Sequence, residues 1–485
     1  MSKSEILYKD VAPGSDDSAF VTINGAQGFA NVEKLPFGVG APGPVISLEK
    51  NYWKLDGAFT HHEHQPVSFW SSTMSGADGT FESPPVITVT FDQQFSSLGI
   101  TLKFDTAAGD YCSSVSIQWY QGVTEKASAQ YTPDSTSFFC EQKVTSYNKV
   151  VITLHTTNKP YRYAKLEQIL FGLHRKFDMT ELRDVAITNE SSLISSELPI
   201  STMKWTLDSR ADVDFMFQLK QPVEVRNDGS LIGVYYIDGY SRSAQSIYSI
   251  DCYDAWGVLD ESPFAGGIYT DYSASALLSN IINGDFPLTI EVEDVSLTGI
   301  IQPCTRREAA QQVLFAWGVC ASTDGWDGIR VFSLNNTAAE IGRNRTFVGV
   351  SVDTAAIVTE VRLSAHTYVQ DSNGSIEIDG VKYSDTETIF TVTNPNVTAS
   401  DKQNVIEVKD ATLVSPTIGQ AAAQRLYDYY SRRNTNKSRF VWKGEHLGDC
   451  ATQPNNWGST NTGHLAKMEI KLSNTVVASC EAIGT

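Results

Sequence analysis

Short runs in which apolar and polar residues alternate dominate the chain, and this period-two pattern predicts strands. The clearest runs lie at residues 19–23, 85–91, 98–104, 114–120 and 149–156. Gly, Asp and Pro separate them at spacings that are typical of a β-sandwich.

One pair of runs predicts a hairpin. Residues 222–226 and 231–237 both alternate, and Asp228 and Gly229 lie between them. Asp-Gly is a favoured pair in the tightest hairpin turns, because both turn residues take positive φ angles. We therefore expect the two runs to pair as antiparallel strands.

Helical periodicity appears only in the second half of the chain. Residues 271–283 place their apolar side chains on one helical face. Thr305 and Glu308 have the spacing of a capping box at the start of a second helix. A third helix is expected after Ser415, which can cap it, with Pro416 at the first helical position.

These elements predict a mainly β chain in five segments. The N-terminal segment is punctuated by Gly and Pro and is expected to be an extended arm, and a small α/β unit separates two β-rich regions in the second half. The expected segments are 1–50 (arm), 51–172 (β-sandwich), 173–264 (first β-rich region), 265–337 (α/β unit) and 338–485 (second β-rich region with one helix).

Composition and charge narrow the class of protein. The chain has 485 residues, of which 41% are hydrophobic and 19% charged, so it can form ordinary globular cores. Its net charge of −19, without a basic stripe, argues against specific nucleic-acid binding. No stretch approaches the ~20 apolar residues of a membrane helix, so we expect no membrane anchor.

The cysteines indicate a reducing compartment. Seven are scattered along the chain and none forms a C-x-x-C pair. We expect free thiols in a protein made in a cytoplasm, and one bridge between Cys112 and Cys140 stays open as an alternative.

The densest group of candidate metal ligands is His61, His62, Glu63 and His64. Zinc requires three or four converging ligands. In a strand, His61 and Glu63 would point away from His62 and His64, so at most two of the four could reach one ion. A hydrated polar turn is the preferred interpretation, and no metal site is predicted.

No catalytic motif is present. The sequence lacks a nucleophile elbow, a phosphate-binding loop, a metalloprotease helix and a dinucleotide fingerprint. Neighbouring acids such as Asp238 and Asp251 are interpreted as solvated strand or turn acids. The acids Asp208, Asp212 and Asp214 are interpreted in the same way. The other histidines are isolated, with no nearby Cys or Ser in a motif: His155, His174, His366, His446 and His464. We therefore assign no catalytic, cofactor-binding or metal-binding residue and expect no cofactor.

Residues 51–172 resemble the discoidin-type jelly roll, a family that also serves as a carbohydrate-binding module. The likeness rests on an opening "DG…WS" and a closing strand "AKLEQILFG". The residues that match are Asp56, Gly57, Trp70, Ser71, Ala164, Leu166, Glu167, Ile169 and Gly172. The resemblance implies a structural calcium at Asp56 and Glu167, but Ala58 stands where the family has a further oxygen ligand, so an intact calcium site is not predicted.

Residues 173–485 resemble the hub protein at the tip of bacteriophage tails. The order of parts matches: a β-barrel, a small α/β insertion and a second β-barrel. The runs that carry the likeness are "GVYYIDGYSRSAQSIYSIDCYDAWGVLD", "TRREAAQQVLFAWG" and "AAAQRLYDYYSRR". The arm, through the runs "FVTINGAQGFANVEKL" and "SLEKNYWKLDGAF" (residues 20–35 and 47–59), is similar to the start of proteins from phages and prophages of Gram-positive bacteria that join both parts in one chain.

The hub resemblance implies a structural virion protein rather than an enzyme. It implies a homotrimer at the tail tip or baseplate, assembled in the cytoplasm of the bacterial host. The implied partners are the tail tube or distal tail protein, the tape-measure protein, and spike or fibre proteins.

Two other functions stay open. The first is an adsorption protein that binds a cell-wall glycan through the discoidin-like domain, where Trp119, Tyr120, Tyr161 and Tyr163 could stack on sugars, although alternate ones are expected in the core. The second, less favoured, is a cell-wall hydrolase that uses a carboxylate pair.

Overall fold

The structure, a computed structural model, is mainly β, as the sequence predicts. It describes residues 4–11, 14–28, 30–38, 47, 49, 68–106, 108–209, 217–398, 402–473 and 475–484. The chain divides into two compact units: unit 1 is Met1–Leu7 with Phe177–Thr485, and unit 2 is Tyr8–Lys176. The division falls within β1 (Ser4–Val11) and β9 (Gly172–Asp178).

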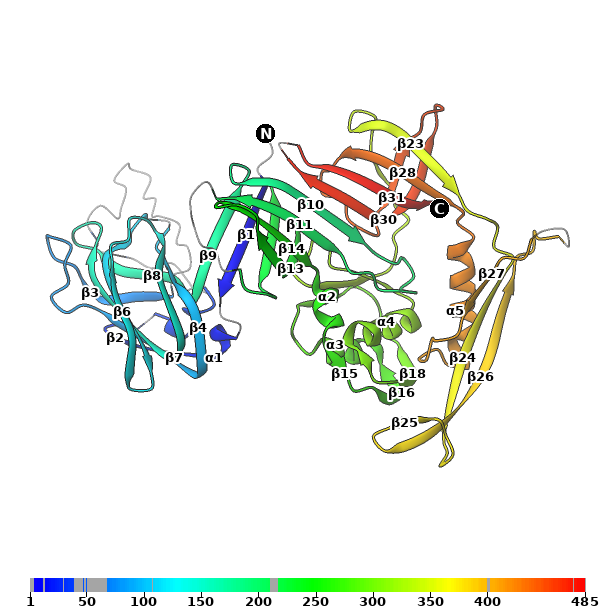
Figure 1. The fold of residues 1–485 in the computed structure, drawn as a ribbon, viewed down its shortest axis with the longest axis horizontal. Coiled ribbons are helices and arrows are strands. Elements are labelled where there is room, and N and C mark those ends of the chain that lie inside the picture. The colour runs from blue at the N-terminus through cyan, green and yellow to red at the C-terminus, as the bar shows by residue number, and fades with distance from the viewer. Residues whose placement is uncertain are drawn as a thin grey trace. The chain divides into compact units, whose positions relative to one another are not determined.

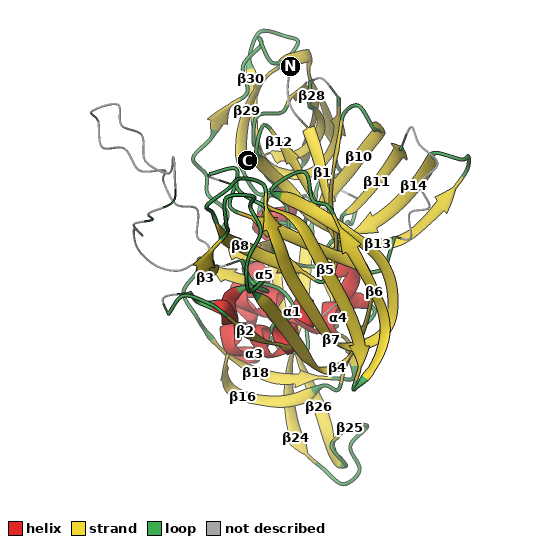
Figure 2. Cartoon of the chain, turned by 90° about the vertical axis from the view of Figure 1, so that its left-hand side faces the viewer, coloured by secondary structure: helices red, strands yellow, loops and turns green. Residues whose placement is uncertain are grey.

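Unit 2 is built from one seven-stranded sheet with the order β3-β8-β4-β7-β5-β6, and β2 pairs with β4. Figure 2 shows β4, β7, β5 and β6 in one curved layer. Its strands are β2 (Ala19–Asn24), β3 (Phe69–Met74), β4 (Val86–Phe104), β5 (Cys112–Gln121), β6 (Thr124–Tyr131), β7 (Ser137–Thr157) and β8 (Tyr163–Leu170). Short turns, α1 (Ser15–Ser18) and η1 (Val32–Lys34), flank β2.

The five strand runs predicted in this half are confirmed, with one difference. The runs at 85–91 and 98–104 belong to a single strand, β4, whose pairing with β7 shifts register three times between Thr90 and Gly99. At Gly99 a Cβ atom would lie 2.2 Å from the carbonyl oxygen of Cys140, so only glycine allows the strand to continue.

The first hairpin of unit 1 forms as expected. Asn227 and Ser230 pair across the turn between β12 (Pro222–Asn227) and β13 (Ser230–Arg242). Asp228 and Gly229 have φ angles of +49° and +84°, which is the left-handed region that this turn requires.

The two β-rich regions of unit 1 share one sheet. Its order is β23-β28-β31-β30-β10-β11-β14-β13-β12-β1-β9; off this path, β29 pairs with β30 and β22 pairs with β29. The two regions meet where β10 pairs with β30, and the path ends at β23 and at β9. The remaining strands are β10 (Leu182–Glu190), β11 (Thr202–Asp208), β14 (Ile247–Tyr253), β22 (Ala339–Glu340), β23 (Thr346–Thr354), β28 (Asn434–Val441), β29 (Cys450–Pro454), β30 (Thr460–Leu472) and β31 (Val477–Gly484).

An α/β region packs below this sheet in Figure 1. Its helices are α2 (Ala255–Asp260), α3 (Ala274–Ile282) and α4 (Arg306–Trp317). The capping box of Thr305 and Glu308 is present, and Gly318 ends α4 in the left-handed conformation. The short strands are β15 (Pro263–Phe264), β16 (Gly267–Ser273), β17 (Leu288–Ile290), β18 (Ser296–Ile301), β19 (Cys304–Thr305), β20 (Cys320–Ser322) and β21 (Ile329–Phe332).

A four-stranded sheet carries the last helix, α5 (Pro416–Tyr430). The sheet order is β25 (Ile376–Ile378), β26 (Val381–Thr393), β24 (Glu360–Gln370) and β27 (Val405–Val408). Pro416 opens α5 as predicted, but Ser415 does not cap it through its side chain. The Ser415 hydroxyl instead lies 2.6 Å from the hydroxyl of Thr417. This side-chain contact competes with a hydrogen bond from the Ser415 hydroxyl to the backbone amides of the helix.

One core serves all the helices of unit 1. It contains the buried faces of α3, α4 and α5 together with β24 residues such as Val361 and Leu363. None of the described helices is long and apolar enough to cross a membrane.

Candidate interaction surface

A row of alternating charges crosses the polar face of the unit 1 sheet. Register places Glu481 of β31 opposite both Lys437 of β28 and Lys467 of β30, and Lys467 also lies opposite Glu190 of β10. Lys437 pairs with Asp353 at 2.9 Å and with Glu481 at 3.4 Å, and Lys467 pairs with Glu190 at 3.2 Å. We call these five residues the charge row.

The charge row holds its own lysines in the charged form. The hydrogen bond to Asp353 and the charge of Glu481 raise the pKa of Lys437, and Glu190 does the same for Lys467. Directly opposed charges of unlike sign stabilise strand pairing modestly. The result is a polar sheet face on which the charges compensate one another.

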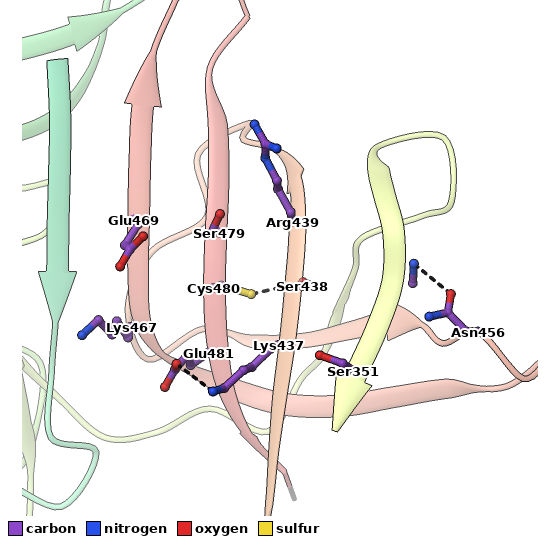
Figure 3. Close-up of a pocket in the computed structure, with 11 residues that line it drawn as sticks. Ser351, Lys437, Ser438, Arg439, Asn456, Lys467, Glu469, Ser479, Cys480 and Glu481 are labelled. Carbon is purple, nitrogen blue, oxygen red and sulfur yellow. Dashed lines mark hydrogen bonds and ion pairs between the residues drawn. The ribbon is translucent and has the colours of Figure 1, made fainter. Parts of the chain in front are cut away.

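A shallow pocket of about 380 Å³ lies beside the charge row (Figure 3). Small residues form its floor, among them Gly349, Ser438 and Ser479. Ser479 lies opposite both Arg439 and Glu469 in the sheet register. Among the described residues, neither Arg439 nor Glu469 has an ion-pair partner within 4.0 Å.

Exposed aromatic residues mark the edge of the sheet next to this pocket. Phe347 of β23 is 54% exposed and Trp457, in the turn between β29 and β30, is 62% exposed. The turn is held against β23, because Asn456 accepts a hydrogen bond of 3.0 Å from the amide of Gly349. Arg439 lies over the Phe347 ring at 5.0 Å. A sheet edge with exposed aromatic rings is a surface suited to contact with another chain.

Unit 2 contains a buried cluster of charges that the sequence pattern does not reveal. The ammonium of Lys165 lies 2.7 Å from Glu49, 3.5 Å from Asp105 and 3.7 Å from Asp110. Arg162 contacts Asp110 at 3.1 Å. All five side chains are buried, and burying a charge is costly unless it is paired.

The cluster connects separate parts of unit 2. Glu49 accepts hydrogen bonds from the amide of Tyr163 at 2.8 Å and from the hydroxyl of Ser47 at 2.6 Å. The Trp70 ring lies 4.8 Å from the Lys165 ammonium. Three carboxylates are matched by Lys165, Arg162 and the half-exposed Lys159. The alternating pattern of side chains along β8 would place Lys165 on the solvent side. Its burial is seen only in the folded unit.

Some of the residues expected from the jelly-roll resemblance lie outside the described residues. Asp56, Gly57, Ala58 and the cluster from His61 to His64 lie outside the described residues. Glu167 is described, and its carboxylate accepts hydrogen bonds from the amide and hydroxyl of Thr106 at 2.8 and 2.6 Å. Among the described residues, no group of three His, Cys, Asp or Glu side chains could hold a metal ion.

The four aromatic candidates for sugar stacking differ in the exposure of their side chains. Trp119 is fully buried in the core of unit 2. Tyr120 is half-buried under Lys149, whose ammonium lies 4.4 Å from the ring, and Tyr163 is half-buried beside Trp70. Tyr161 is 42% exposed.

The other titratable candidates have partners within the protein. His155 contacts Ser116 at 2.8 Å, and His366 contacts Asp385 at 2.7 Å. Asp251 pairs with the exposed Lys204 at 2.9 Å, whereas Asp208 pairs with Arg183. The side chain of His174 and residues Asp212 and Asp214 lie outside the described part. All seven cysteines are free, so the expectation of free thiols is confirmed and the Cys112–Cys140 bridge is absent.

Comparisons with known proteins concern the fold. No family model matches the sequence, and no curated protein matches it. The 43 kDa tail protein of prophage MuSo2 from Shewanella oneidensis has a similar structure, with 9% identity, a TM-score of 0.46 and coverage of 64% of this chain and 95% of that one.

Two further solved structures are similar. The tail protein from Neisseria meningitidis MC58 has 12% identity and a TM-score of 0.46, and the match covers 64% of this chain and 93% of that one. Prophage tail protein gp18 from Listeria monocytogenes EGD-e has 12% identity and a TM-score of 0.42, with coverage of 63% and 91%.

Proposed function

We propose that this chain is a structural protein of a bacteriophage tail, a homotrimeric hub at the tail tip or baseplate. The observation that carries the proposal is the open sheet of unit 1, in which both β-rich regions are joined through β10 and β30. Three such sheets, placed end to end, supply six β-rich regions to one ring. The order of parts in the sequence resembles that of tail hubs, as described above.

The surface of the sheet supports this arrangement. Its last strand, β23, is bridged by the turn after β29 through Val350 and Asn455, and this end of the sheet exposes Phe347 and Trp457, which would be covered in a ring. Its polar face carries the charge row, and compensated charges suit the wall of a channel through which DNA passes without binding. In this role the chain continues the tail tube, receives the tape-measure protein and contacts spike or fibre proteins. We assign it no enzymatic activity.

Replacing Phe347 and Trp457 by Ser is expected to weaken self-association. Large aromatic side chains at an interface contribute about 2 kcal/mol or more each, so the double variant F347S/W457S should dissociate at protomer concentrations where the wild type is trimeric. Sedimentation velocity at a series of concentrations measures this.

The control is Val123→Ser, which alters an exposed apolar residue in the turn between β5 and β6 of unit 2. This variant should sediment as the wild type does. A wild type that stays monomeric at every concentration would refute the trimeric hub. If the F347S/W457S variant is trimeric, the β23 edge is not part of the interface.

A second candidate function is host adsorption through a cell-wall glycan. Tyr161 favours this function, because its ring is exposed. The residue lies in the short segment before β8, where its backbone has a positive φ of +54°. An exposed tyrosine can stack on a sugar ring. Retention of the full chain on purified cell walls, compared with Tyr161→Ala, distinguishes adsorption from a purely structural role.

A further inference from the structure

Unit 1 contains a second hollow, of about 440 Å³, beside α5. We call it the arginine pocket. Arg425 of α5 and Arg432, just beyond its end, line it, together with an apolar wall. That wall is made of Leu193, Ile194, Leu334 and Ala421.

Arg425 is held at the end of α4. Its guanidinium donates a hydrogen bond to the carbonyl of Phe315 in the last turn of that helix and lies 5.4 Å from the Phe315 ring. A helix C-terminus carries about half a negative charge, so it offsets only part of the guanidinium charge. Burial lowers the pKa of Arg425, and its Nε atom is buried without a hydrogen-bond partner.

Arg432 is held by a neutral residue. Its Nη1 lies 3.3 Å from Nδ1 of His464, which is fully buried, and Nε2 of His464 lies 3.2 Å from the carbonyl of Asn335. Burial and the charge of Arg432 both lower the pKa of His464, so the imidazole is neutral at pH 7. His464 therefore orients Arg432 without compensating its charge.

The pocket has an uncompensated positive charge. Among the described residues, no carboxylate oxygen lies within 4.0 Å of either guanidinium. Asp428 also lines the pocket, but it accepts a hydrogen bond of 2.8 Å from Gln424. Two cations thus face one carboxylate, in a chain whose net charge is −19. Both arginines are partly buried, and an anion in the pocket would compensate the excess positive charge.

We propose that the arginine pocket binds a carboxylate attached to an apolar group. The planar guanidinium matches a carboxylate with two parallel hydrogen bonds. The apolar wall would bury the group that carries the carboxylate. The ligand is either a small organic acid or an acidic side chain of a partner polypeptide flanked by apolar residues. This inference does not depend on the proposed function.

Titration calorimetry on the full chain tests the proposal. The probes are 4-methylpentanoate, its neutral amide, inorganic phosphate, and a blocked pentapeptide with one glutamate between two leucines. The carboxylate probes should bind. The amide should bind at least tenfold more weakly, because it lacks the charge-assisted hydrogen bonds, which contribute about 1.5–3 kcal/mol. Phosphate should also bind more weakly than the carboxylate probes, because it has no apolar group to contact the apolar wall. Tighter binding of the pentapeptide indicates a partner polypeptide, and tighter binding of 4-methylpentanoate indicates a small acid.

Two variants and one control locate the binding. Arg432→Gln should lower the affinity about tenfold or more, since it removes the charge. Ala421→Trp, at an exposed position on the wall, should block the pocket while leaving both arginines in place. Arg433→Gln removes a neighbouring exposed arginine that bonds to the carbonyl of Ala355 and should bind as the wild type does. Equal binding by the wild type and Ala421→Trp, equal binding of acid and amide, or no binding by the wild type would overturn the proposal.

Discussion

Replacing Lys165 by Met is expected to destabilise unit 2 by about 3–5 kcal/mol, the cost of leaving buried charges without their partner. The ammonium is 1% exposed and is approached by three buried carboxylates. Methionine has a similar volume but no charge, so Glu49 and Asp105 would lose the compensation that Lys165 provides, whereas Asp110 would keep Arg162 and Lys159. The loss is electrostatic and should not depend on packing.

Amide hydrogen exchange, measured by mass spectrometry, locates this effect. Protection should fall in peptides from β7 and β8 and stay unchanged in the sheet of unit 1. Adding Glu49→Gln to Lys165→Met should restore part of the stability, because it removes one of the unpaired carboxylates. Lys126→Met, at an exposed position on the edge strand β6, is the control and should change stability by no more than about 0.5 kcal/mol. Unchanged protection in Lys165→Met would mean that the buried cluster contributes little.

Replacing Asp254 by Asn is expected to change how the stability of unit 1 depends on pH. Asp254 caps α2, where its carboxylate accepts hydrogen bonds from the amides of Trp256 and Gly257 and from the hydroxyl of Thr323. It is fully buried, and this burial raises its pKa from 3.8 to about 6. Asn keeps the cap, since its oxygen accepts the amides and its nitrogen can donate to Thr323, but it does not titrate.

The direction of the effect follows from the raised pKa. The folded protein binds the proton more tightly than the unfolded chain, so the stability from this group is complete below about pH 4 and is lost as the pH rises to about 6. A shift of about two units corresponds to about 3 kcal/mol. The free energy of unfolding of Asp254→Asn, relative to wild type, should therefore rise by about 3 kcal/mol between pH 4 and pH 7.

Urea denaturation at fixed protomer concentration over this pH range checks the prediction. Asp251→Asn is the matched control, because Asp251 is more than half exposed and forms an ion pair with the exposed Lys204. Its difference from wild type should stay nearly constant with pH. A constant difference for Asp254→Asn as well would show that the carboxyl of Asp254 titrates normally in the fold.

Local chemistry explains which elements could be predicted from the sequence. The Asp228-Gly229 turn and the Thr305–Glu308 capping box depend on residues within a few positions of one another, and both form as expected. The cap at Ser415 failed for an equally local reason, the nearby hydroxyl of Thr417. That residues 86–104 form one strand could not be predicted, because its continuation through Gly99 depends on the close approach of Cys140 in the neighbouring strand.

The sites depend on residues that are distant in sequence. The charge row requires the register of five strands drawn from residues 190 to 481, and the Lys165 cluster joins residues 49, 105, 110 and 165. The arginine pocket likewise needs α5 to reach the end of α4. Two candidates could be suggested by the linear pattern. The histidine cluster lies outside the described residues, and Trp119 lies in the core of unit 2.

Electron microscopy of the purified full chain tests the central claim most directly. We expect class averages with threefold symmetry and a ring, built from the unit 1 sheets, that surrounds a central opening. Particles of a single chain, or dimers without an opening, at concentrations well above those used for sedimentation would contradict the proposal that this protein is a trimeric tail hub.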